Sequence, residues 1–486
     1  MSRLQIRQGR ATVAAFLIVA LSAAGCSTNP ATGKAQLALI SEDQEIAMGK
    51  EADQQVVQSL GLYQDQELQS YVNRLGQRLA KESERPNLPW TFRVVDDPVV
   101  NAFAFPGGYI YVTRGLLSHL TSEAELVSVL GHEIGHVTGR HSVEQMSKQQ
   151  LAQIGLVAGM ILKPELANYG DLAQTGLSLV FLKYGRDDER QADDLGLKYM
   201  AREGYDPREM PQVFQTLGRV SQQQGAGRIP GWLSTHPTPE NRVGRIQDTI
   251  AKSGRDFSNA TVNREAYLRS IDDIVFGQNP REGYFRGNTF IQPELAFQIQ
   301  FPQGWQTSNQ KAQVGAISPN QDAIVVVSLA RQGSAQAAAR EFFSQQGIQQ
   351  GQAVRADLGG VPAVTNVFGV QGQNGDIQGV ASFAELDGKV YQILGYTMAS
   401  NFNRYGNLLS SAIGTFSKVT DRRLLNVEPR RVDVVTIPSA MTLEEFNRRY
   451  PSTVDLETLA IINQVDGNSR FAAGDEVKRV VGGEPA

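Results

Sequence analysis

The stretch GHEIGH, residues 131–136, decides the fold and the chemistry that this sequence predicts. On an α-helix, residues four apart lie on one face, so His132 and His136 can direct both imidazoles at one cation, with Glu133 beside them. This H-E-x-x-H pattern is typical of zinc hydrolases. The alternative interpretation is a pair of core histidines next to a surface glutamate.

The residues around this stretch predict a helix that is buried in the protein. Ser122 and Glu125 have the spacing of a capping box, in which each side chain accepts a hydrogen bond from the backbone of the other residue. Apolar residues follow at helical spacing: Leu126, Val129, Leu130, Ile134 and Val137. We therefore expect the two histidines to lie on a rigid element.

The length and composition indicate a globular protein of several domains. A chain of 486 residues is too long for one hydrophobic core and suggests about three domains. The apolar fraction of 41% and the charged fraction of 20% are ordinary for soluble proteins. The net charge of -4 favours no nucleic-acid partner, so partners must be inferred from sites.

Residues 1–25 resemble a signal peptide and not a part of the fold. Arg3, Arg7 and Arg10 form a basic region, and residues 11–24 are an apolar run too short to span a membrane comfortably. The segment predicts export of the chain.

The sequence AAGC at residues 23–26 resembles a bacterial lipobox, in which the cysteine becomes the acylated first residue. Cys26 is the only cysteine in the chain, which argues against a disulfide and suits a lipid attachment point. Because Ser27 follows it, and not aspartate, we expect an outer-membrane lipoprotein that faces the periplasm, with residues 26–40 as a tether. The alternative is ordinary signal cleavage and a soluble periplasmic product.

A second polar stretch, RDDERQAD at residues 186–193, carries the carboxylates that the histidine pair needs. Glu189 and Asp193 share one helical face, with small residues between them. Two nitrogen ligands and one carboxylate leave the fourth tetrahedral position open for water, as catalytic zinc sites require. We expect Glu189 to be the third ligand and Asp193 to hydrogen-bond the distal nitrogen of a zinc-bound histidine. Taken alone, this acidic stretch would indicate a solvated helix face.

Strand-like runs precede the histidine helix, at residues 91–95, 101–105 and 109–113. The last two runs predict a hairpin, and an exposed edge of this hairpin could take an extended peptide as an additional strand. Asn101, Ala102 and Phe103 are therefore our candidates for substrate binding. Plain core packing is the alternative.

The other elements of this half of the chain are expected to be scaffold. Residues 41–60 and 65–81 predict two helices. Residues 142–184 are apolar and interrupted by glycines, and each apolar run is shorter than the ~20 residues of a membrane span. We expect two helices that cover the cleft here, with peripheral membrane contact as the alternative.

Two further histidines, His141 and His119, are expected to be structural. The stretch from His132 continues like a metzincin, whose third histidine would fall at position 142, but that residue is Ser142. His141 is one residue out of register and would face away from the site on a continuing helix.

Spaced motifs together resemble a known family of peptidases. They are residues 101–108, 132–136, 189–193 and 234–237 with Arg242. Over about residues 40–255, the chain resembles the zinc endopeptidases related to the CAAX prenyl endopeptidase, of the gluzincin type, and within them the periplasmic branch. The resemblance implies one zinc ion per chain. Its ligands would be His132, His136 and Glu189. Glu133 would be the general base.

The resemblance also assigns His236 and Arg242 to the catalytic centre. His236 lies in the stretch GWLSTHP, residues 231–237, and Arg242 begins the next predicted helix. In relatives with this motif the histidine is thought to approach the metal or to stabilise the reacting carbonyl. We expect His236 to reach the zinc and to occupy the water position in a self-inhibited resting state; an ordinary loop histidine is the alternative.

Two modules without a catalytic pattern are expected after the peptidase domain, which we place at residues 41–275. Residues 285–420 contain FPQGW near their start and resemble the PsbP-like α+β fold. Residues 430–482 resemble a LysM module, which binds peptidoglycan glycans. The expected fold class is thus multidomain α+β: a mainly helical zincin domain with a small sheet, an α+β sheet domain and a small βααβ module.

We interpret the chain as a zinc-dependent endopeptidase of the bacterial envelope that cleaves misfolded or unassembled envelope and outer-membrane proteins. Glu133 would take a proton from the attacking water and pass it to the leaving amine. The expected partners are polypeptide substrates, the membrane through the lipid, and peptidoglycan through the LysM-like module. The alternatives are a chaperone or scaffold lipoprotein whose metal site stays closed, and a hydrolase of peptidoglycan peptides.

Overall fold

The structure is a computed structural model of the chain, and it describes residues 26–162, 184–224, 231–236, 241–371 and 375–483. They form two compact units. Unit 1 takes its residues from Met1–Val57, Gly61–Ile274 and Val432–Val481, and unit 2 is mainly Val275–Arg431. Helices and several sheets are both present, so the predicted α+β class is confirmed. The expected signal peptide lies outside the described residues, and the expected domain boundaries remain predictions.

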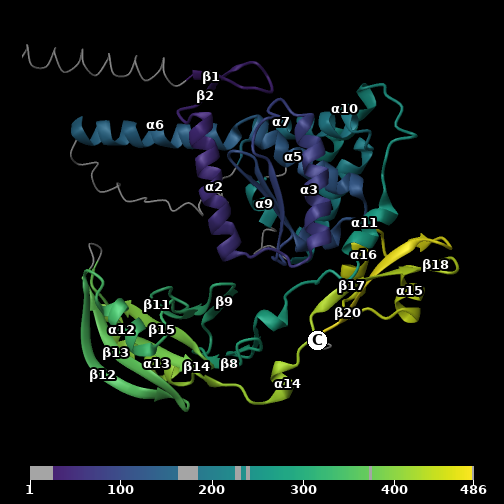
Figure 1. Cartoon of the computed structure of the whole chain (residues 1–486). Helices are drawn as coiled ribbons and strands as arrows, with labels where there is room; N and C mark the ends of the chain where they lie inside the picture. The colour runs from purple at the N-terminus through teal and green to yellow at the C-terminus, as the bar shows by residue number, and fades with distance from the viewer. Residues whose placement is uncertain (1–25, 163–183, 225–230, 237–240, 372–374, 484–486) are drawn as a thin grey trace, which may run out of the picture. The chain divides into compact units, whose positions relative to one another are not determined.

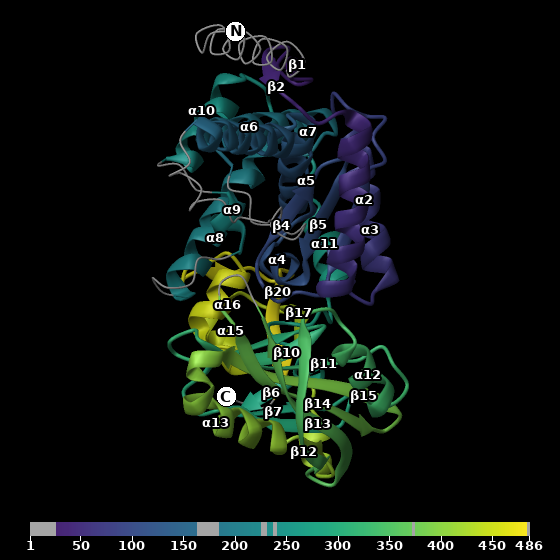
Figure 2. The same ribbon diagram turned by 90° about the vertical axis from the view of Figure 1, so that its left-hand side faces the viewer.

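Unit 1 is mainly helical (Figures 1 and 2). Its helices are α2 (Glu42–Ser59), α3 (Gln66–Lys81), α4 (Arg114–His119), α5 (Glu123–Thr138), α6 (His141–Leu162), α7 (Arg186–Arg202), α8 (Met210–Gln224), α9 (Gly231–Thr235), α10 (Arg242–Lys252), α11 (Arg264–Ile271), α15 (Leu443–Arg449) and α16 (Leu456–Ile462). The two helices predicted at residues 41–60 and 65–81 are confirmed as α2 and α3. The second helix expected within residues 142–184 falls largely on residues 163–183, outside the described ranges. None of the helices that the structure describes is both long and apolar enough to cross a membrane.

The strands of unit 1 form small sheets. They are β1 (Cys26–Thr28), β2 (Ala35–Leu37), β3 (Thr91–Val95), β4 (Ala102–Phe105), β5 (Tyr109–Thr113), β17 (Arg430–Thr436), β18 (Met441–Thr442), β19 (Arg470–Phe471) and β20 (Glu476–Gly482). The predicted hairpin is confirmed, because β4 pairs with β5 antiparallel, and β3 joins β5 from the other side in parallel. The amino-terminal hairpin is β1 paired with β2.

Helix α5, which carries the H-E-x-x-H stretch, is the centre of unit 1. Every residue from Glu123 to Thr138 is buried, so this helix is buried all around and not only along one apolar stripe. The Ser122 side chain accepts from Glu125 N, as predicted. The reciprocal half of the capping box is wrong: the Glu125 carboxylate accepts from Thr121 N at 2.5 Å and from Gln464 Nε2 at 3.0 Å. The carboxylate thus binds the backbone one residue before the expected position, and the carboxyl-terminal segment adds a second donor.

Helices α5 and α7 pack with their backbones unusually close. An added Cβ at Gly131 would lie 3.2 Å from Gly196 Cα, and one at Gly135 would lie 2.9 Å from Ala192 Cα. Small residues at these positions therefore let the histidine face of one helix meet the carboxylate face of the other.

The carboxyl-terminal segment, Val432–Val481, belongs to unit 1. Its predicted β-α-α-β order is confirmed by β17, α15, α16 and β20. The buried Lys478 Nζ donates to Ser118 O at 2.9 Å and to Leu120 O at 2.6 Å, just before α5 begins. These backbone oxygens have no helical partner there, so the lysine satisfies them.

Unit 2 is built on an antiparallel sheet with the order β12-β13-β14-β15-β11-β10-β9. Its strands are β9 (Gln306–Gln310), β10 (Gln313–Ile317), β11 (Ala323–Leu329), β12 (Ile348–Leu358), β13 (Val361–Val370), β14 (Ile377–Leu386) and β15 (Lys389–Met398). A second sheet has β6 (Tyr284–Arg286), β7 (Thr289–Gln292), β8 (Phe297–Gln300) and β16 (Ser417–Lys418). The helices are α12 (Ala335–Phe343), α13 (Phe402–Gly414) and α14 (Arg422–Leu425).

Replacing Gly135 by alanine should destabilise unit 1, because the new methyl group would lie 2.9 Å from both the Cα and the carbonyl oxygen of Ala192. We expect the free energy of unfolding to fall by about 1–3 kcal/mol, the usual cost of overpacking. Urea unfolding followed by circular dichroism measures it. Gly218→Ala on α8 is the matched control, since an added Cβ there meets no atom within 4 Å. Equal losses of stability in the two variants would contradict the packing argument.

Candidate metal centre

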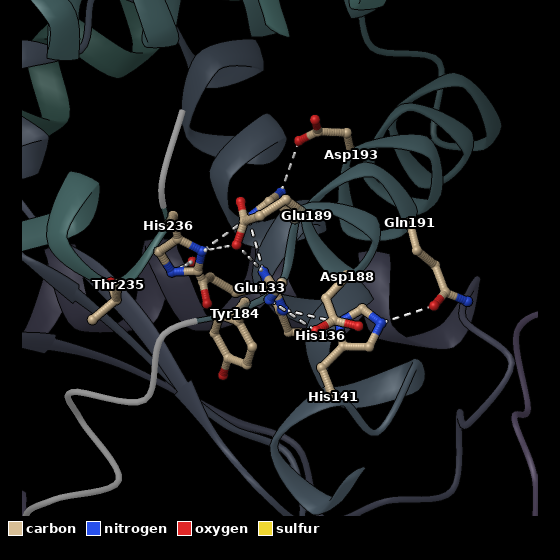
Figure 3. A network of polar contacts seen from close by, with 12 residues as sticks. Glu133, His136, His141, Tyr184, Asp188, Glu189, Gln191, Asp193, Thr235 and His236 are labelled. Carbon is tan, nitrogen blue, oxygen red and sulfur yellow. Dashed lines mark hydrogen bonds and ion pairs between the residues drawn. The ribbon is translucent and has the colours of Figure 1, made fainter. Parts of the chain in front are cut away.

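Four side chains from three segments bring potential metal ligands together in unit 1. They are His132 and His136 of α5, Glu189 of α7 and His236, which follows α9, and one atom of each lies within 4.8 Å of the others. All four are buried. Figure 3 shows His136, Glu189 and His236 directed toward one another.

The nitrogen and oxygen atoms of these four side chains are close enough to bind one metal ion together. His132 Nε2 and His136 Nε2 are 3.0 Å apart. Glu189 Oε2 lies 3.6 Å from His132 Nε2, and Glu189 Oε1 lies 3.5 Å from His136 Nε2. His236 Nδ1 is 2.9 Å from Glu189 Oε1 and 3.3 Å from His132 Nε2.

A second layer holds these donors in place through Asp193 and Arg242. His132 Nδ1 donates to Asp193 Oδ1 at 3.0 Å, and Arg242 Nη2 donates to the same oxygen at 2.5 Å. Arg242 Nη1 lies 2.9 Å from Glu189 Oε2, and its guanidinium is 4.0 Å from the centroid of the Phe214 ring. The arginine is thus buried between a carboxylate pair and an aromatic face, which positions both acids.

Burial and the facing charges set the protonation of the second layer. Although burial alone would raise the pKa of Asp193, the Arg242 charge and the His132 hydrogen bond lower it to about 2. Burial lowers the pKa of His132 to about 3 and that of His141 to about 4. For Glu189, burial would raise the pKa, but the His236 and His136 rings lower it well below its usual value. Asp193 is therefore an acceptor, and the rings of His132 and His141 are neutral near pH 7.

The donor set fits a zinc ion. Because His132 uses Nδ1–H for Asp193, its Nε2 presents a lone pair to the Nε2 of His136 at 3.0 Å, beside the carboxylate of Glu189. A cation bound between them would relieve the repulsion between facing lone pairs and a carboxylate. Tetrahedral zinc with Zn–N bonds of about 2.0–2.1 Å places its donor atoms about 3.3 Å apart. The separations of 3.0, 3.5 and 3.6 Å agree with that geometry.

Glu133 lies next to the donors with one oxygen held and one free. Trp232 Nε1 donates to Glu133 Oε1 at 3.2 Å, and His236 Nε2 is 3.6 Å from the same oxygen. Oε2 is buried and accepts no hydrogen bond from the residues that the structure describes. Burial raises the pKa of Glu133 to about 7. A buried carboxylate with one free oxygen is suited to accepting a proton.

The proposed substrate strand is placed differently from the expectation. β4 is the terminal strand of its sheet, but Asn101, Ala102 and Phe103 are buried, so the expected exposed edge is wrong for this structure. α9 packs beside this strand: an added Cβ at Gly231 would lie 2.7 Å from Val99 Cγ1 and 3.1 Å from Asn101 Cγ. The short helix therefore lies against the residues that lead into β4. Cys26 lies in β1, paired with Leu37.

The predicted orientation of His141 is also wrong. It does not face away from the site, because α5 ends at Thr138 and the chain turns at Gly139 and Arg140 before α6 begins. His141 Nδ1 lies 2.9 Å from His136 Nδ1. The glycine that ends α5 was the sequence signal for this turn.

Other contributors carry no signal in the sequence alone. The Tyr184 ring stacks on His136 with centroids 3.9 Å apart. Trp232 holds the Glu133 carboxylate, and Gln191 contacts His141. Aromatic and amide side chains occur throughout most sequences, so only their placement in space identifies these residues.

Comparison with known proteins agrees with this geometry. Residues 66–250 match Peptidase family M48. The chain is 34% identical over 209 residues to a putative beta-barrel assembly-enhancing protease of Vibrio cholerae, over 41% of this chain and 43% of that protein. It is 30% identical over 274 residues to the beta-barrel assembly-enhancing protease of Escherichia coli, over 52% and 56%. A mitochondrial metalloendopeptidase of Arabidopsis thaliana is 33% identical over 46% of this chain and 43% of its own length.

The chain spans about half the length of these curated relatives. Among solved structures, a cyanobacterial PsbP from Synechocystis is 16% identical, with a TM-score of 0.22 over 27% of this chain and 91% of that chain. The PsbP-like and LysM-like assignments remain predictions.

Asp193→Asn should weaken zinc binding by about 10-fold to 100-fold, because the charged acceptor behind His132 is lost. Competition with a chromophoric chelator measures the affinity. Asp194→Asn is the matched control on the next residue: its side chain is 58% exposed and pairs with Arg245. A loss of affinity of the same size in the control would assign the effect to the charge of α7 and not to the contact with His132.

Proposed function

Because residues 66–250 carry a Peptidase family M48 domain, we propose that this chain is a zinc-dependent endopeptidase of the bacterial cell envelope. The observation that carries the proposal is the meeting of His132, His136 and Glu189 at 3.0 to 3.6 Å, with the free oxygen of Glu133 beside them. Hydrolysis of a peptide bond needs a Lewis acid and a base. This set of residues supplies sites for both.

The proposed reaction uses one zinc ion per chain. When bound, zinc polarises the scissile carbonyl and lowers the pKa of water at the site to about 7. Glu133 takes the proton of the attacking water at Oε2 and delivers it to the leaving amine. In the resting state, Trp232 holds the Glu133 carboxylate by its hydrogen bond to Oε1. This leaves one carboxylate oxygen for proton transfer.

His236 is proposed to give the resting state of the site. Its Nδ1 is as close to Glu189 and His132 as the other donors are to one another, so it can fill the fourth tetrahedral position. A water cannot occupy that position at the same time. Catalysis then requires His236 to move, after which its ring can stabilise the reacting carbonyl.

Substrate binding is proposed at β4, through Asn101, Ala102 and Phe103. The buried Asn101 Oδ1 accepts no hydrogen bond from the described residues, which suits a later peptide partner. Since α9 carries Trp232 and leads directly into His236, displacement of α9 would open the strand and release the fourth position together.

The location and substrates are proposed from the relatives. Two of them are named for beta-barrel assembly, so misfolded or unassembled outer-membrane proteins are the proposed substrates. Cys26 is proposed to carry the lipid that anchors an outer-membrane lipoprotein in the periplasm. The segment 430–482 is proposed to contact peptidoglycan, and no nucleic-acid partner is proposed.

Glu133→Gln should keep zinc and lose proteolysis by about 100-fold to 10,000-fold, because an amide cannot accept the proton of water. Cleavage of an unfolded outer-membrane protein, with and without a chelator, measures this, and metal analysis checks occupancy. Cleavage at the wild-type rate by this variant would contradict the role of Glu133. Suppressed aggregation without any zinc-dependent cleavage would favour the chaperone alternative, and release of peptides from purified sacculi would favour the peptidoglycan alternative.

His236→Ala should bind zinc more weakly and cleave an unfolded substrate faster than the wild type. The variant loses one donor atom, and the fourth position becomes available to water. Chelator competition and initial rates on the same preparation measure the two effects. Unchanged affinity together with an unchanged rate would remove His236 from the proposed resting state.

A further inference from the structure

The two metal-facing histidines of α5 are held in different ways. His132 has the carboxylate of Asp193 behind it. His136 instead has another imidazole behind it: its Nδ1 lies 2.9 Å from the Nδ1 of His141 (Figure 3). On its other side, the His141 ring contacts Gln191, whose Oε1 is 2.8 Å from His141 Nε2.

The end of α5 is built so that His141 can turn back to His136. Gly139 follows the helix, and an added Cβ there would lie 2.5 Å from His141 Nε2. Arg140 adopts a left-handed conformation with φ of 55°, which reverses the chain before α6. Its side chain is fixed by Glu45, at 3.2 Å from Nε, and by Ile40 O, at 2.8 Å from Nη2. This turn therefore brings a residue outside the helical register onto the metal ligand.

Hydrogen bonds connect Asn29, Gln191, His141 and His136 in that order. Backbone groups at Asn29 determine which atom donates in each of them. Asn29 Nδ2 donates to Gly139 O at 3.0 Å, and a carbonyl oxygen can only accept. Asn29 Oδ1 accepts from the backbone N–H groups of Ala31 and Thr32, which can only donate. The orientation of the Asn29 amide is thus determined.

The orientation of the Asn29 amide determines the directions of the hydrogen bonds at Gln191, His141 and His136. Gln191 Nε2 lies 3.4 Å from Asn29 Oδ1 and donates to it, so Gln191 Oε1 faces His141. The neutral ring of His141 must donate from Nε2, which leaves its Nδ1 as an acceptor. His136 then donates from Nδ1 and keeps the lone pair of Nε2 for the metal-facing side.

We propose that His141 and Gln191 are positioning residues for the zinc ligand His136, which select its metal-binding tautomer and its ring orientation. Neither residue contacts the reacting atoms, and both act through His136. The inference rests on the proposed zinc site and adds a second support on α7 that is independent of Asp193. It also links the amino-terminal hairpin, through Asn29, to a metal ligand.

The test compares His141→Leu, which removes both ring nitrogens, with His141→Asn, whose Oδ1 can replace the Nδ1 acceptor. We expect His141→Leu to bind zinc about 10-fold to 100-fold more weakly and to change the visible absorption of the cobalt-substituted protein. His141→Asn should recover most of the affinity and the wild-type spectrum. His119→Leu is the matched control, because this histidine contacts Gly115 O and not the ligands.

Recovery of zinc affinity in His141→Asn distinguishes a positioning role of His141 from a packing role. If packing alone mattered, leucine would fill the cavity better than asparagine. Where His141→Leu does not fold, Gln191→Leu replaces it and should weaken zinc binding in the same direction. Zinc affinity and a cobalt spectrum equal to the wild type in His141→Leu or Gln191→Leu would overturn the proposal, as would an asparagine variant no better than leucine.

These measurements need no substrate, so they can contradict the positioning role of His141 and Gln191 without contradicting the proposed peptidase activity. A wild-type protein that binds zinc and cleaves nothing would remove the proposed peptidase and leave the positioning role in place. A wild-type protein that does not bind zinc would overturn both.

Discussion

Close backbone contact between α5 and α7 is the constraint on which the metal centre depends. The histidine nitrogens of α5 and the Glu189 oxygens of α7 lie 3.5 and 3.6 Å apart. This close approach is possible because Gly131 faces Gly196 and Gly135 faces Ala192, so that no side chain larger than a methyl group stands at these contacts. The close packing of α5 on α7 is therefore also what brings the metal ligands together, because an added methyl group at Gly131 or Gly135 would move them apart.

The same contact forces several charges into the interior, and the structure neutralises them as a set. Glu189, Asp193 and Arg242 are all buried, and an isolated buried ion would be strongly unfavourable. Arg242 pairs with both carboxylates, and Arg245 adds a second cation at Asp193 Oδ2. Asp193 Oδ1 is shared by Arg242 Nη2 and His132 Nδ1. These contacts hold each carboxylate from more than one side. Partners of this kind fix the orientation of metal ligands.

Both ends of α5 are held by parts of the chain that are distant in sequence. A buried helix leaves backbone groups without partners at each end. Directly before α5, Lys478 donates to Ser118 O and Leu120 O, the carbonyls left free where α4 ends, and Gln464 donates to the carboxylate of Glu125 in the first turn of α5. At its end, Asn29 and Gln36 both donate to Gly139 O. The first and last described segments of unit 1 therefore support the helix that carries the histidines, and the carboxyl-terminal segment is part of the same compact unit.

The sequence by itself determined what is local. Periodicity and caps located α2, α3, the β4–β5 hairpin and the β-α-α-β end of the chain, and the spacing of four residues put His132 and His136 on one face. The pairing of Glu189 with these histidines could be proposed because its helical face was small and acidic. Tertiary structure decided the rest. His141 was misplaced because its position depends on a helix that stops at Thr138, and Glu125 because its partner Gln464 comes from the far end of the chain. The expected exposed edge of β4 is buried, and α9 packs against Val99 and Asn101 before it, a contact that no local pattern encodes. Periodicity reports only which side of an element is apolar, whereas the partner of a buried polar group is chosen by whichever segment the whole fold brings next to it.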